Sequence, residues 1–575
     1  MTILSTSTST DTTVALTDSA QTLKLNFNER SDFKSPLEEQ FQFDAALWQY
    51  PDRQPLEALI AEKFALKPSE VICTNGGDEA IMILMRLIKE SSQVILPLPA
   101  FSQYTWGIDS WKLEATIIDG KTDLSIDTEA TLAAINTSSD AVVIITRPNN
   151  PSGEMIAMTA LKEIIETAKE NKSWVFLDEA YIEFSDGCDD GCSNETTKLL
   201  LKQYDNLVIL RTLSKAYGLA GIRLGYLLGS ESLIAEFDKR CAPFNIATPT
   251  LTIAAAALSD AEQQDVKNYC LRIRENRQQI FADLRANNIN VLPSQANFLV
   301  LQLPNLQSSA VESFLAKNNI MVRSFTGSMS NCLRITIPYD IDKLSKLLQQ
   351  ALYPDLVCLD MDGVLIDTSG SYDATVIATV KTLSGTTITT TDIEQLKSTA
   401  GFNNDWVLSQ KLLSDLGVEL ELDEIINVFQ RIYLGDSLGG GLVQNETIIL
   451  SQSLTELIKA SSTTFAIVTG RPLMEAKAGA KFIGLENLDL ISLDCVENAK
   501  PSPEGINRLQ NKYSTSSWMC GDNPDDMQAA LASNSLAIGI TGNSNKSKQQ
   551  ALYQAGADIV LNDINELEKW LCPLK

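Results

Sequence analysis

One stretch indicates the fold most strongly: Ala141-Val142-Val143-Ile144-Ile145-Thr146, an unbroken run in which five of the six residues are β-branched. It lacks the polar alternation of a half-exposed strand, so it is typical of a strand that is buried on both faces. Similar runs, separated by helical patterns, occur at residues 71–74, 94–97, 174–177, 206–210 and 225–228. This alternation predicts an α/β fold with parallel sheets.

A smaller unit is expected after the last of these strands. Between residues 260 and 350, a long helical pattern precedes short strand-like runs at 297–302 and 333–337. A long helix followed by a few short strands is not a repeated strand–helix unit, so we expect a separate α+β subdomain in this part of the chain.

A second α/β region is predicted beyond it. A new apolar run at 356–359 follows Tyr353-Pro354-Asp355, so we place a domain boundary near residue 352. Strand and helix patterns then resume, except from about residue 369 to 458. That segment lacks strand-like runs, which predicts an inserted helical cap.

Composition excludes several classes of protein. The 575 residues carry a net charge of -27, which argues against a general nucleic-acid binder, although phosphorylated small molecules remain possible. No apolar run is long enough to span a membrane, so we expect no membrane contact. The Ser/Thr-rich residues 1–21 are expected to form a disordered tail, and the ten scattered cysteines indicate reduced thiols and a cytoplasmic location.

The chain contains no histidine. Hydrolysis by a Ser-His-Asp triad and zinc binding by histidine are therefore both excluded. Any proton transfer must be carried out by Lys, Asp, Glu, Tyr or Cys side chains.

A set of motifs in the first half suits a lysine that activates an aldehyde cofactor. Such a cofactor needs helix N–H groups and hydroxyls for its phosphate, a carboxylate for its pyridine nitrogen, an aromatic ring against its face and donors for its phenolic oxygen. The sequence offers these groups in order at residues 76–79, 99–104, 148–153, 178–181, 214–215 and 223.

These motifs resemble the fold type I pyridoxal-phosphate aminotransferases, and among them the histidinol-phosphate aminotransferase family. The runs that carry the resemblance are Leu25-Asn26-Phe27-Asn28-Glu29, Tyr50-Pro51-Asp52, Asp178-Glu179-Ala180-Tyr181-Ile182-Glu183-Phe184, Arg211-Thr212-Leu213-Ser214-Lys215, Ser294-Gln295-Ala296-Asn297-Phe298 and Leu333-Arg334-Ile335-Thr336. The resemblance covers about residues 22 to 345. It implies a large three-layer α/β/α domain and a small α+β domain, which we place at residues 22–350.

The resemblance implies a role for each matching residue around the cofactor. Lys215 would hold pyridoxal 5'-phosphate as a Schiff base and move the proton, while Asp178 would pair with the pyridine nitrogen. Asn150 and Tyr181 would hydrogen-bond the phenolic oxygen, and Phe101, where the family usually has tyrosine, would stack on the ring. The cofactor phosphate would be held by Gly77, Asp78, Thr212, Ser214 and Arg223.

Further implied roles concern substrates and assembly. Tyr50 would reach the cofactor phosphate of a neighbouring subunit, which implies a homodimer. Arg334 would bind the carboxylate of glutamate as amino donor, and Arg323 is a candidate for a substrate phosphate.

A second set of motifs suits the hydrolysis of a phosphate ester. Asp360 and Asp362 lie two residues apart after a predicted strand, so one carboxylate could attack phosphorus while the other exchanges a proton with the leaving group. Three further blocks follow: Phe465-Ala466-Ile467-Val468-Thr469-Gly470-Arg471, Lys500-Pro501-Ser502-Pro503-Glu504 and Gly521-Asp522-Asn523-Pro524-Asp525-Asp526. They supply a hydroxyl, a cation and carboxylates suited to Mg²⁺.

In this order, the four blocks resemble the phosphatases of the haloacid dehalogenase superfamily. The resemblance implies a Rossmann-like domain, placed at residues 353–575, with the helical cap. It makes Asp360 the nucleophile and Asp362 the acid and base, with Thr469 and Lys500 binding the phosphate. The Mg²⁺ ligands would be Asp360, Asp362, Asp522 and Asp526, with Asp525 as an alternative to Asp526.

Together, the two resemblances suggest a bifunctional enzyme of histidine biosynthesis. It would transfer nitrogen from glutamate to imidazole-acetol phosphate and then hydrolyse the resulting histidinol phosphate. Other hypotheses stay open: the first half could transaminate another amino acid or decarboxylate a phosphorylated one. The second half could be a phosphomutase, a broad phosphatase or a regulatory binding module.

Overall fold

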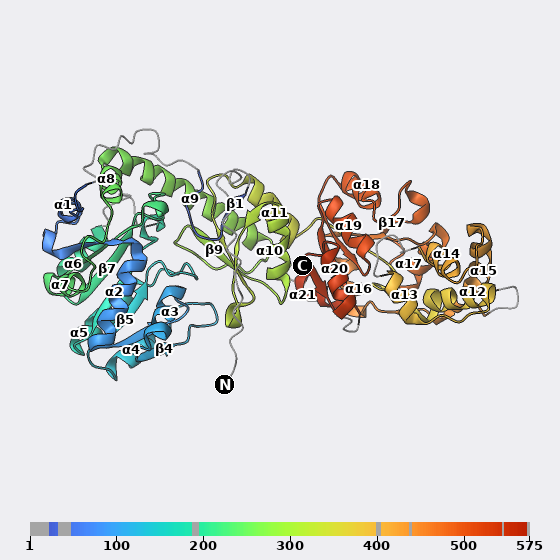
Figure 1. Ribbon diagram of the computed structural model, residues 1–575, viewed down its shortest axis with the longest axis horizontal. Helices are drawn as coiled ribbons and strands as arrows, with labels where there is room; N and C mark the ends of the chain where they lie inside the picture. The colour runs from blue at the N-terminus through green and yellow to red at the C-terminus, as the bar shows by residue number, and fades with distance from the viewer. Residues whose placement is uncertain are drawn as a thin grey trace.

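The computed structural model describes residues 22–32, 48–186, 195–397, 404–435, 440–542 and 546–571. The tail expected at residues 1–21 lies outside the described residues. The chain is elongated: a large α/β lobe lies at one end, a small α+β unit in the middle and a second α/β lobe beyond it, with a group of helices at the far tip (Figure 1).

The first lobe is built on a seven-stranded sheet with strand order β2-β8-β7-β6-β5-β3-β4. Each strand-like run predicted in this region coincides with one of these strands to within two residues, whereas β4 was not predicted because its side chains are largely exposed at the sheet edge. The strands are β2 (Val71–Asn75), β3 (Gln93–Pro97), β4 (Ala115–Ile118), β5 (Ala141–Thr146), β6 (Trp174–Asp178), β7 (Leu207–Thr212) and β8 (Leu224–Gly229).

One strand departs from the predicted parallel arrangement. β8 runs antiparallel to both of its neighbours, β7 and β2. Residues 213–223 between β7 and β8 hold only the short 3-10 helix η3 (Ala220–Ile222). A parallel return needs a longer crossover, usually a helix, so the chain turns back beside β7 instead.

Helices cover both faces of this sheet, which confirms the three-layer prediction. Val142 and Ile144 of β5 share one core with α2, α3 and α7, and Val143 and Ile145 share another with α1, α4, α5 and α6. This follows from the twofold alternation of side chains along a strand. The helices are α1 (Gln54–Phe64), α2 (Gly76–Ser91), α3 (Ser102–Trp111), α4 (Thr128–Asn136), α5 (Met158–Glu170), α6 (Glu195–Gln203), α7 (Glu231–Asp238) and α8 (Thr248–Ala257), with the 3-10 helices η1 (Pro68–Glu70) and η2 (Ile182–Phe184).

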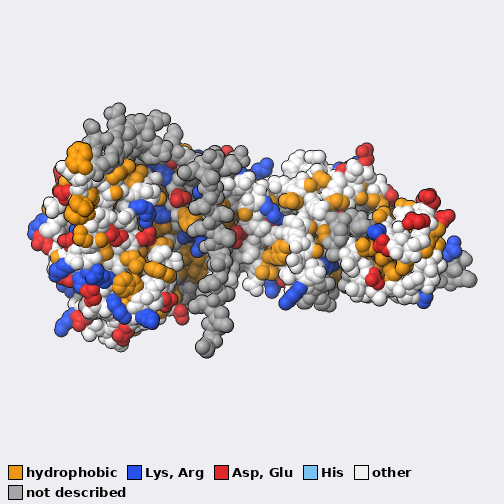
Figure 2. Space-filling model, viewed as in Figure 1, with side chains coloured by type: hydrophobic (Ala, Val, Ile, Leu, Met, Phe, Trp, Pro, Cys, Tyr) orange, Lys and Arg blue, Asp and Glu red, His pale blue; other side chains and the backbone are white. Residues whose placement is uncertain are grey.

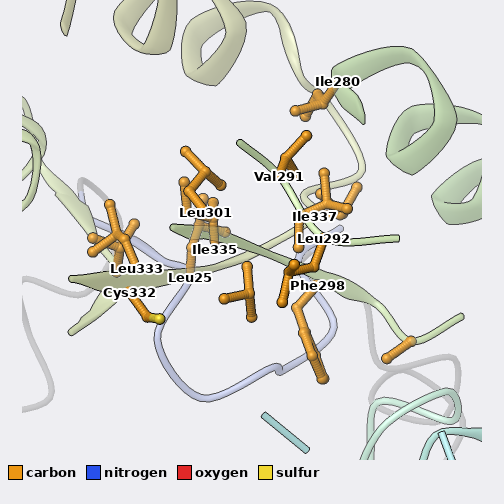
Figure 3. Packing of buried hydrophobic residues seen from close by; sticks show 14 of the residues in the cluster. Leu25, Ile280, Val291, Leu292, Phe298, Leu301, Cys332, Leu333, Ile335 and Ile337 are labelled. Carbon is orange, nitrogen blue, oxygen red and sulfur yellow. The ribbon is translucent and has the colours of Figure 1, made fainter. Parts of the chain in front are cut away.

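The small unit begins with the long helix α9 (Asp260–Ala286) and is α+β, as predicted. An antiparallel sheet of order β11-β12-β9 is its centre, and β1 pairs in parallel with β10. Figure 3 shows Leu25 from the N-terminal segment packed among Phe298, Ile335 and Ile337. Its elements are β1 (Leu23–Lys24), β9 (Phe298–Gln302), α10 (Gln307–Lys317), β10 (Ile320–Met321), β11 (Arg323–Ser324), η4 (Gly327–Met329), β12 (Cys332–Thr336) and α11 (Asp342–Leu352).

The second lobe holds a six-stranded sheet of order β17-β16-β13-β18-β19-β20, in which every pair is parallel. Helices α18, α19 and α20 pack on one face, and α16, α17 and α21 pack on the other. Strands and helices are β13 (Leu356–Leu359), α16 (Gln452–Ala460), β16 (Thr464–Val468), α17 (Leu473–Phe482), β17 (Asp489–Ile491), η7 (Leu493–Cys495), α18 (Glu504–Tyr513), β18 (Ser517–Gly521), α19 (Pro524–Ala532), β19 (Leu536–Ile540), α20 (Lys546–Gln554), β20 (Ile559–Leu561), η8 (Ile564–Leu567) and α21 (Glu568–Leu571).

A helical segment is inserted between β13 and β16. It has a hydrophobic cluster of its own, which includes Tyr372, Leu408, Phe429 and Tyr433. Helix α16, which falls inside the predicted cap range, packs instead with the core of the second lobe. The insertion contains β14 (Ile366–Asp367), the π-helix η5 (Ser369–Asp373), α12 (Ala374–Ser384), α13 (Thr390–Lys397), α14 (Asp405–Asp415), α15 (Leu422–Leu434), η6 (Leu442–Asn445) and β15 (Thr447–Ile448).

The small unit and the second lobe share a buried interface. The indole of Trp518, which is 0% exposed, donates a hydrogen bond to the carbonyl of Gln350 at 2.7 Å. Lys317 on α10 pairs with the buried carboxylate of Asp558 at 2.6 Å, and Ser313 donates to the same carboxylate at 2.8 Å. The two parts therefore pack as neighbours rather than being joined only by the chain.

Charged and apolar side chains share the drawn surface of the protein. On the face drawn in Figure 2, basic side chains lie among acidic and apolar ones over both lobes. Within the described part of the chain, no helix combines the length and apolarity needed to cross a bilayer.

Two candidate active sites

The predicted site residues of the first lobe meet at one edge of its sheet. In the parallel strands β5, β6 and β7, Thr146 lies beside Asp178 and Asp178 beside Leu210. Their carboxyl ends therefore point the same way. Strand β7 ends at Thr212, and Lys215 follows three residues later at this same edge.

The N-terminus of α2 joins this edge because Asn75, at the end of β2, pairs with Leu224 at the start of β8. Arg223 has a φ of 56° and lies so close to Gly76 that a Cβ on that glycine would be 2.5 Å from the guanidinium. Its guanidinium pairs with Asp78 at 2.6 Å. The Asn75 side chain does not cap the helix, so the first N–H groups of α2 can bind an anion.

The other predicted phosphate-binding groups adjoin this helix end. Thr212 Oγ1 lies 2.9 Å from Ser214 Oγ and donates to the carbonyl of Leu224 at 3.0 Å. Gly77 is in the first turn of α2, and β8 can approach this turn because Gly225 has no side chain: a Cβ on Gly225 would be 2.8 Å from the Gly77 nitrogen. Hydroxyls, helix N–H groups and a guanidinium thus surround one position, which fits a phosphate group.

Asp178 is the buried carboxylate at the end of β6. It accepts hydrogen bonds from the Tyr104 hydroxyl at 2.7 Å and from the N–H of Ala180 at 3.0 Å. Burial raises the pKa of Asp178 to about 6, although both hydrogen bonds oppose that rise. None of the described residues forms an ion pair with Asp178, and such a buried carboxylate suits a protonated pyridine nitrogen.

Lys215 lies between the N-terminal segment and Tyr181. Its Nζ donates to the carbonyl of Phe27 at 2.9 Å and lies 5.8 Å from the centre of the Tyr181 ring. The Tyr181 hydroxyl accepts from Asn28 at 3.1 Å and from Asn150 at 3.4 Å. Lys215 therefore lies beside Tyr181 and Tyr181 beside Asn150, and the N-terminal segment contacts the lysine through Phe27 and the tyrosine through Asn28.

Two arginines face each other across the small unit's sheet. Arg334 on β12 is paired in register with Arg323 on β11. Arg334 is buried, and it donates to Asn150 Oδ1 at 2.5 Å and to the Asn26 carbonyl at 2.8 Å, whereas Arg323 is exposed. Burial lowers the pKa of Arg334, and the charge of Arg323 lowers it further. Like charges oppose each other here, which favours a bound anion between them.

Two predicted residues remain, Phe101 and Tyr50, and neither is fully buried. Phe101 precedes α3, is partly buried and lies edge-on to Tyr104 with ring centres 6.3 Å apart. Tyr50 is 80% exposed and stacks on Phe244 at 4.4 Å. Tyr50 and Phe244 thus form an exposed aromatic pair on the first lobe.

We expect Asp178→Asn to stabilise the cofactor-free protein above pH 6. The carboxyl has a pKa of about 6 instead of its ordinary 3.8, so its ionised form lowers the free energy of unfolding by about 3 kcal/mol at neutral pH. Asparagine removes this cost but loses one hydrogen bond, which is worth about 1 kcal/mol. Because the folded pKa is raised, wild-type stability falls as pH rises through 6. Urea unfolding at pH 5 and pH 7.5 would measure this.

The matched control is Asp109→Asn, an exposed carboxylate on α3. It should leave the pH dependence as in wild type. The expectation would be contradicted if the free energy of unfolding of wild type, compared with that of Asp178→Asn, did not fall between pH 5 and pH 7.5.

In the second lobe, three carboxylates converge at the ends of two adjacent strands. Asp360 follows β13, and Asp522 and Asp526 follow β18, with one carboxylate oxygen of each within 4.8 Å of the others. Lys500 pairs with Asp360 at 2.7 Å and with Asp526 at 2.5 Å, and Lys548 pairs with Asp522 at 2.7 Å. Three hard oxygen donors fit Mg²⁺.

Two carboxylates of this cluster, Asp360 and Asp526, have pKa values that burial shifts. Burial raises the pKa of Asp360 well above its ordinary range; Lys500 opposes the rise, and the carboxylates of Asp526, Asp362 and Asp522 add to it. Burial also raises the pKa of Asp526. A divalent cation would relieve this repulsion.

Asp362 lies apart from the trio, in a pair with Arg471. The Arg471 guanidinium contacts the Asp362 carboxylate at 2.6 Å and that of Glu446 at 2.9 Å, and it lies 5.1 Å from the centre of the Tyr372 ring. Thr469 is buried at the end of β16, and its hydroxyl accepts from the N–H of Arg471 at 3.2 Å. The predicted acid and base is thus held beside, not within, the carboxylate trio.

We expect Mg²⁺ to stabilise the wild-type protein against heat. At a hundredfold excess over its dissociation constant, a bound ion adds about 2.7 kcal/mol, which raises the unfolding midpoint by about 5–10 °C. Asp522→Asn, at a partly exposed ligand, should abolish most of this rise, whereas Glu486→Gln, on the surface, should retain it. Unfolding would be followed by tryptophan fluorescence. An equal rise in the unfolding midpoint of all three proteins would disprove a specific Mg²⁺ site.

Some functional side chains were missed from the sequence. Tyr104 and Asn28 lie in motifs that were noted, and Arg471 directly follows a predicted strand end, so these had a signal. Glu446 and Lys548 had none, because both are distant in sequence from the residues that they contact.

Comparison with known proteins supports both halves. Residues 36–350, more than half of the chain, match the family Aminotransferase class I and II. The chain belongs to this family. Residues 357–540 of this aminotransferase-family chain match the family Haloacid dehalogenase-like hydrolase. The chain is therefore an enzyme with an aminotransferase part and a hydrolase part.

Individual relatives align with the aminotransferase part. The histidinol-phosphate aminotransferase of Methanosarcina barkeri is 32% identical over 313 residues, covering 53% of this chain and 81% of that protein. The enzyme of the same name from Yersinia enterocolitica is 34% identical over 326 residues, covering 54% and 82%. A crystal structure of histidinol-phosphate aminotransferase from Sinorhizobium meliloti in complex with pyridoxal-5'-phosphate has 23% identity, a TM-score of 0.49, and covers 57% of this chain and 90% of that one.

Proposed function

We propose that this enzyme aminates imidazole-acetol phosphate with glutamate and then hydrolyses the product, histidinol phosphate, to histidinol. The observation that carries the first step is the convergence of Lys215, Asp178 and the α2 N-terminus at one sheet edge, together with relatives named histidinol-phosphate aminotransferase. The second step is supported by the Asp360 site and the hydrolase match.

In the first site, pyridoxal 5'-phosphate would supply the electron-withdrawing ring on which nitrogen is exchanged. The carboxylate of Asp178 would keep the pyridine nitrogen protonated, while Tyr104 holds that carboxylate in place. Lys215 Nζ would bind the cofactor and carry the proton between the α-carbon of the substrate and the aldehyde carbon of the cofactor. Tyr181 and Asn150 would orient the ring through its phenolic oxygen.

The two arginines would bind the acidic substrates. Arg334 would receive the carboxylate of glutamate, and its buried Nε, which has no hydrogen-bond partner among the described atoms, is available for it. Arg323 would contact the phosphate of the keto substrate. One pocket could then bind both substrates in turn, because each presents an anion at its far end.

In the second site, Mg²⁺ on Asp360, Asp522 and Asp526 would neutralise the phosphate of histidinol phosphate. The Asp360 carboxylate would attack phosphorus, and Lys500 and Thr469 would orient the phosphate oxygens. Asp362 would protonate the leaving oxygen and then activate water. Its ion pair with Arg471 keeps the side chain close to this position.

We propose that residues 22–350 and 353–575 are the two catalytic parts and that α12 to α15 form a cap over the second site. Tyr50 would complete a partner's site in a homodimer. Small molecules, not nucleic acid or membranes, would be the partners, and the enzyme would act in the cytoplasm.

A coupled assay tests the function. Purified protein is given imidazole-acetol phosphate, glutamate, pyridoxal 5'-phosphate and Mg²⁺, and histidinol, 2-oxoglutarate and phosphate are measured. All three should form, with phosphate after 2-oxoglutarate. Formation of 2-oxoglutarate without phosphate would disprove the second step, and absence of 2-oxoglutarate would disprove the first.

A further inference from the structure

The pocket beside the Asp360 site has a wall that belongs to the helical insertion. The pocket is lined by Asp360, Asp362 and Arg471 from the second lobe and by Tyr372, Asp405 and Trp406 from the insertion. If phosphate occupies the carboxylate end, the leaving group of the ester must lie against this wall. A leaving group in this pocket would contact the side chains of this wall.

The charges around this wall are unbalanced. Arg471 is the cation of the lining, and it is shared by the carboxylates of Asp362 and Glu446. Asp405 shares Lys397 with Asp373, at 3.0 and 2.8 Å. Arg471 and Lys397 are thus each paired with two carboxylates. Each of these two groups, one on each side of the pocket, has one negative charge in excess.

The Asp405 carboxylate is incompletely compensated. Burial raises its pKa, Lys397 opposes the rise, and the charges of Asp373 and Asp362 add to it. The N-terminus of α14 offers no site for an anion here, because the Asn404 side chain accepts from the N–H groups of Trp406 and Val407. A cation bound in the pocket would supply the positive charge that the Asp405 carboxylate lacks.

Two aromatic side chains complete this wall. Tyr372 and Trp406 both line the pocket, and the guanidinium of Arg471 already lies 5.1 Å from the centre of the Tyr372 ring. Aromatic faces attract organic cations and reject carboxylates. Carboxylates and aromatic rings together are the side chains expected around an ammonium or imidazolium group.

We propose that Asp405, Trp406 and Tyr372 form a subsite for an organic cation, so that the hydrolase site selects phosphate monoesters whose leaving group carries an amine. This inference rests on the proposed hydrolysis at Asp360. The subsite adds to that proposed hydrolysis by assigning the choice of substrate to the helical insertion. Esters with a second anion, such as phosphorylated carboxylic acids, would be the poorest substrates.

The test compares three small esters with the full-length protein and Mg²⁺: ethanolamine phosphate, propyl phosphate and phosphoglycolate. The kcat/KM for phosphate release should be at least about tenfold higher for ethanolamine phosphate than for propyl phosphate, and lowest for phosphoglycolate. Asp405→Asn should reduce the ratio between the first two esters at least about tenfold, mainly through KM. The control Asp415→Asn, at an exposed carboxylate on the same helix, should keep the wild-type ratio.

Three results would overturn the inference. Equal kcat/KM for the three esters in wild type would overturn it without any variant, while leaving the phosphatase proposal intact. Equal losses for all esters in Asp405→Asn would mean a structural role for that residue. Hydrolysis of none of the esters, nor of histidinol phosphate, would reject the phosphatase proposal and the subsite with it.

Discussion

Lys215→Ala is expected to lose aminotransfer by at least about 10⁴-fold, because it removes both the attachment point of the cofactor and the group that moves the proton. The Nζ of Lys215 lies among Phe27, Tyr181 and the strand ends that carry Asp178. Among the lysines that the structure describes, Lys215 is the one with these contacts. The loss should be measured as 2-oxoglutarate formation from glutamate and keto substrate.

The same variant should lose the visible absorbance of pyridoxal 5'-phosphate bound to the protein. Lys202→Ala, at an exposed position on α6, is the matched control and should keep both the absorbance and the activity. Phosphate release should be unchanged in Lys215→Ala, since Asp360 follows β13 in the second lobe. Retention of the absorbance band would rule out Lys215 as the cofactor lysine.

Asp360→Asn is expected to abolish phosphate release, with a loss of at least about 10⁴-fold, because an amide is a far weaker nucleophile than a carboxylate. Asparagine matches the shape of aspartate and can still accept from Lys500, which contacts Asp360 at 2.7 Å. The fold should therefore be kept. Phosphate should be measured with histidinol phosphate and Mg²⁺.

Aminotransfer should be unaffected in Asp360→Asn, so that histidinol phosphate accumulates in the coupled assay in place of histidinol. Asp423→Asn, at an exposed carboxylate on α15, controls for the change of charge. If Asp360→Asn released phosphate at more than one hundredth of the wild-type rate, another residue would have to be the nucleophile.

The sequence alone determined the order of elements and the residues at the strand ends. Buried strands such as 141–146 are readable because both faces of a parallel sheet are apolar, and the groups that follow them are readable because carboxyl ends of parallel strands share one edge. Lys215, Asp178 and Asp360 were therefore predictable from their place after such strands.

Other features depended on contacts between distant segments. The antiparallel direction of β8, the opposition of Arg323 and Arg334, and the pair of Asp362 with Arg471 follow from register and packing, which no local pattern encodes. The same is true of Asp558, whose partners on α10 lie some 240 residues away in the chain. Local sequence determines which segments become strands and helices. Only the tertiary structure decides which polar side chains share a buried space, because that depends on how those segments pack.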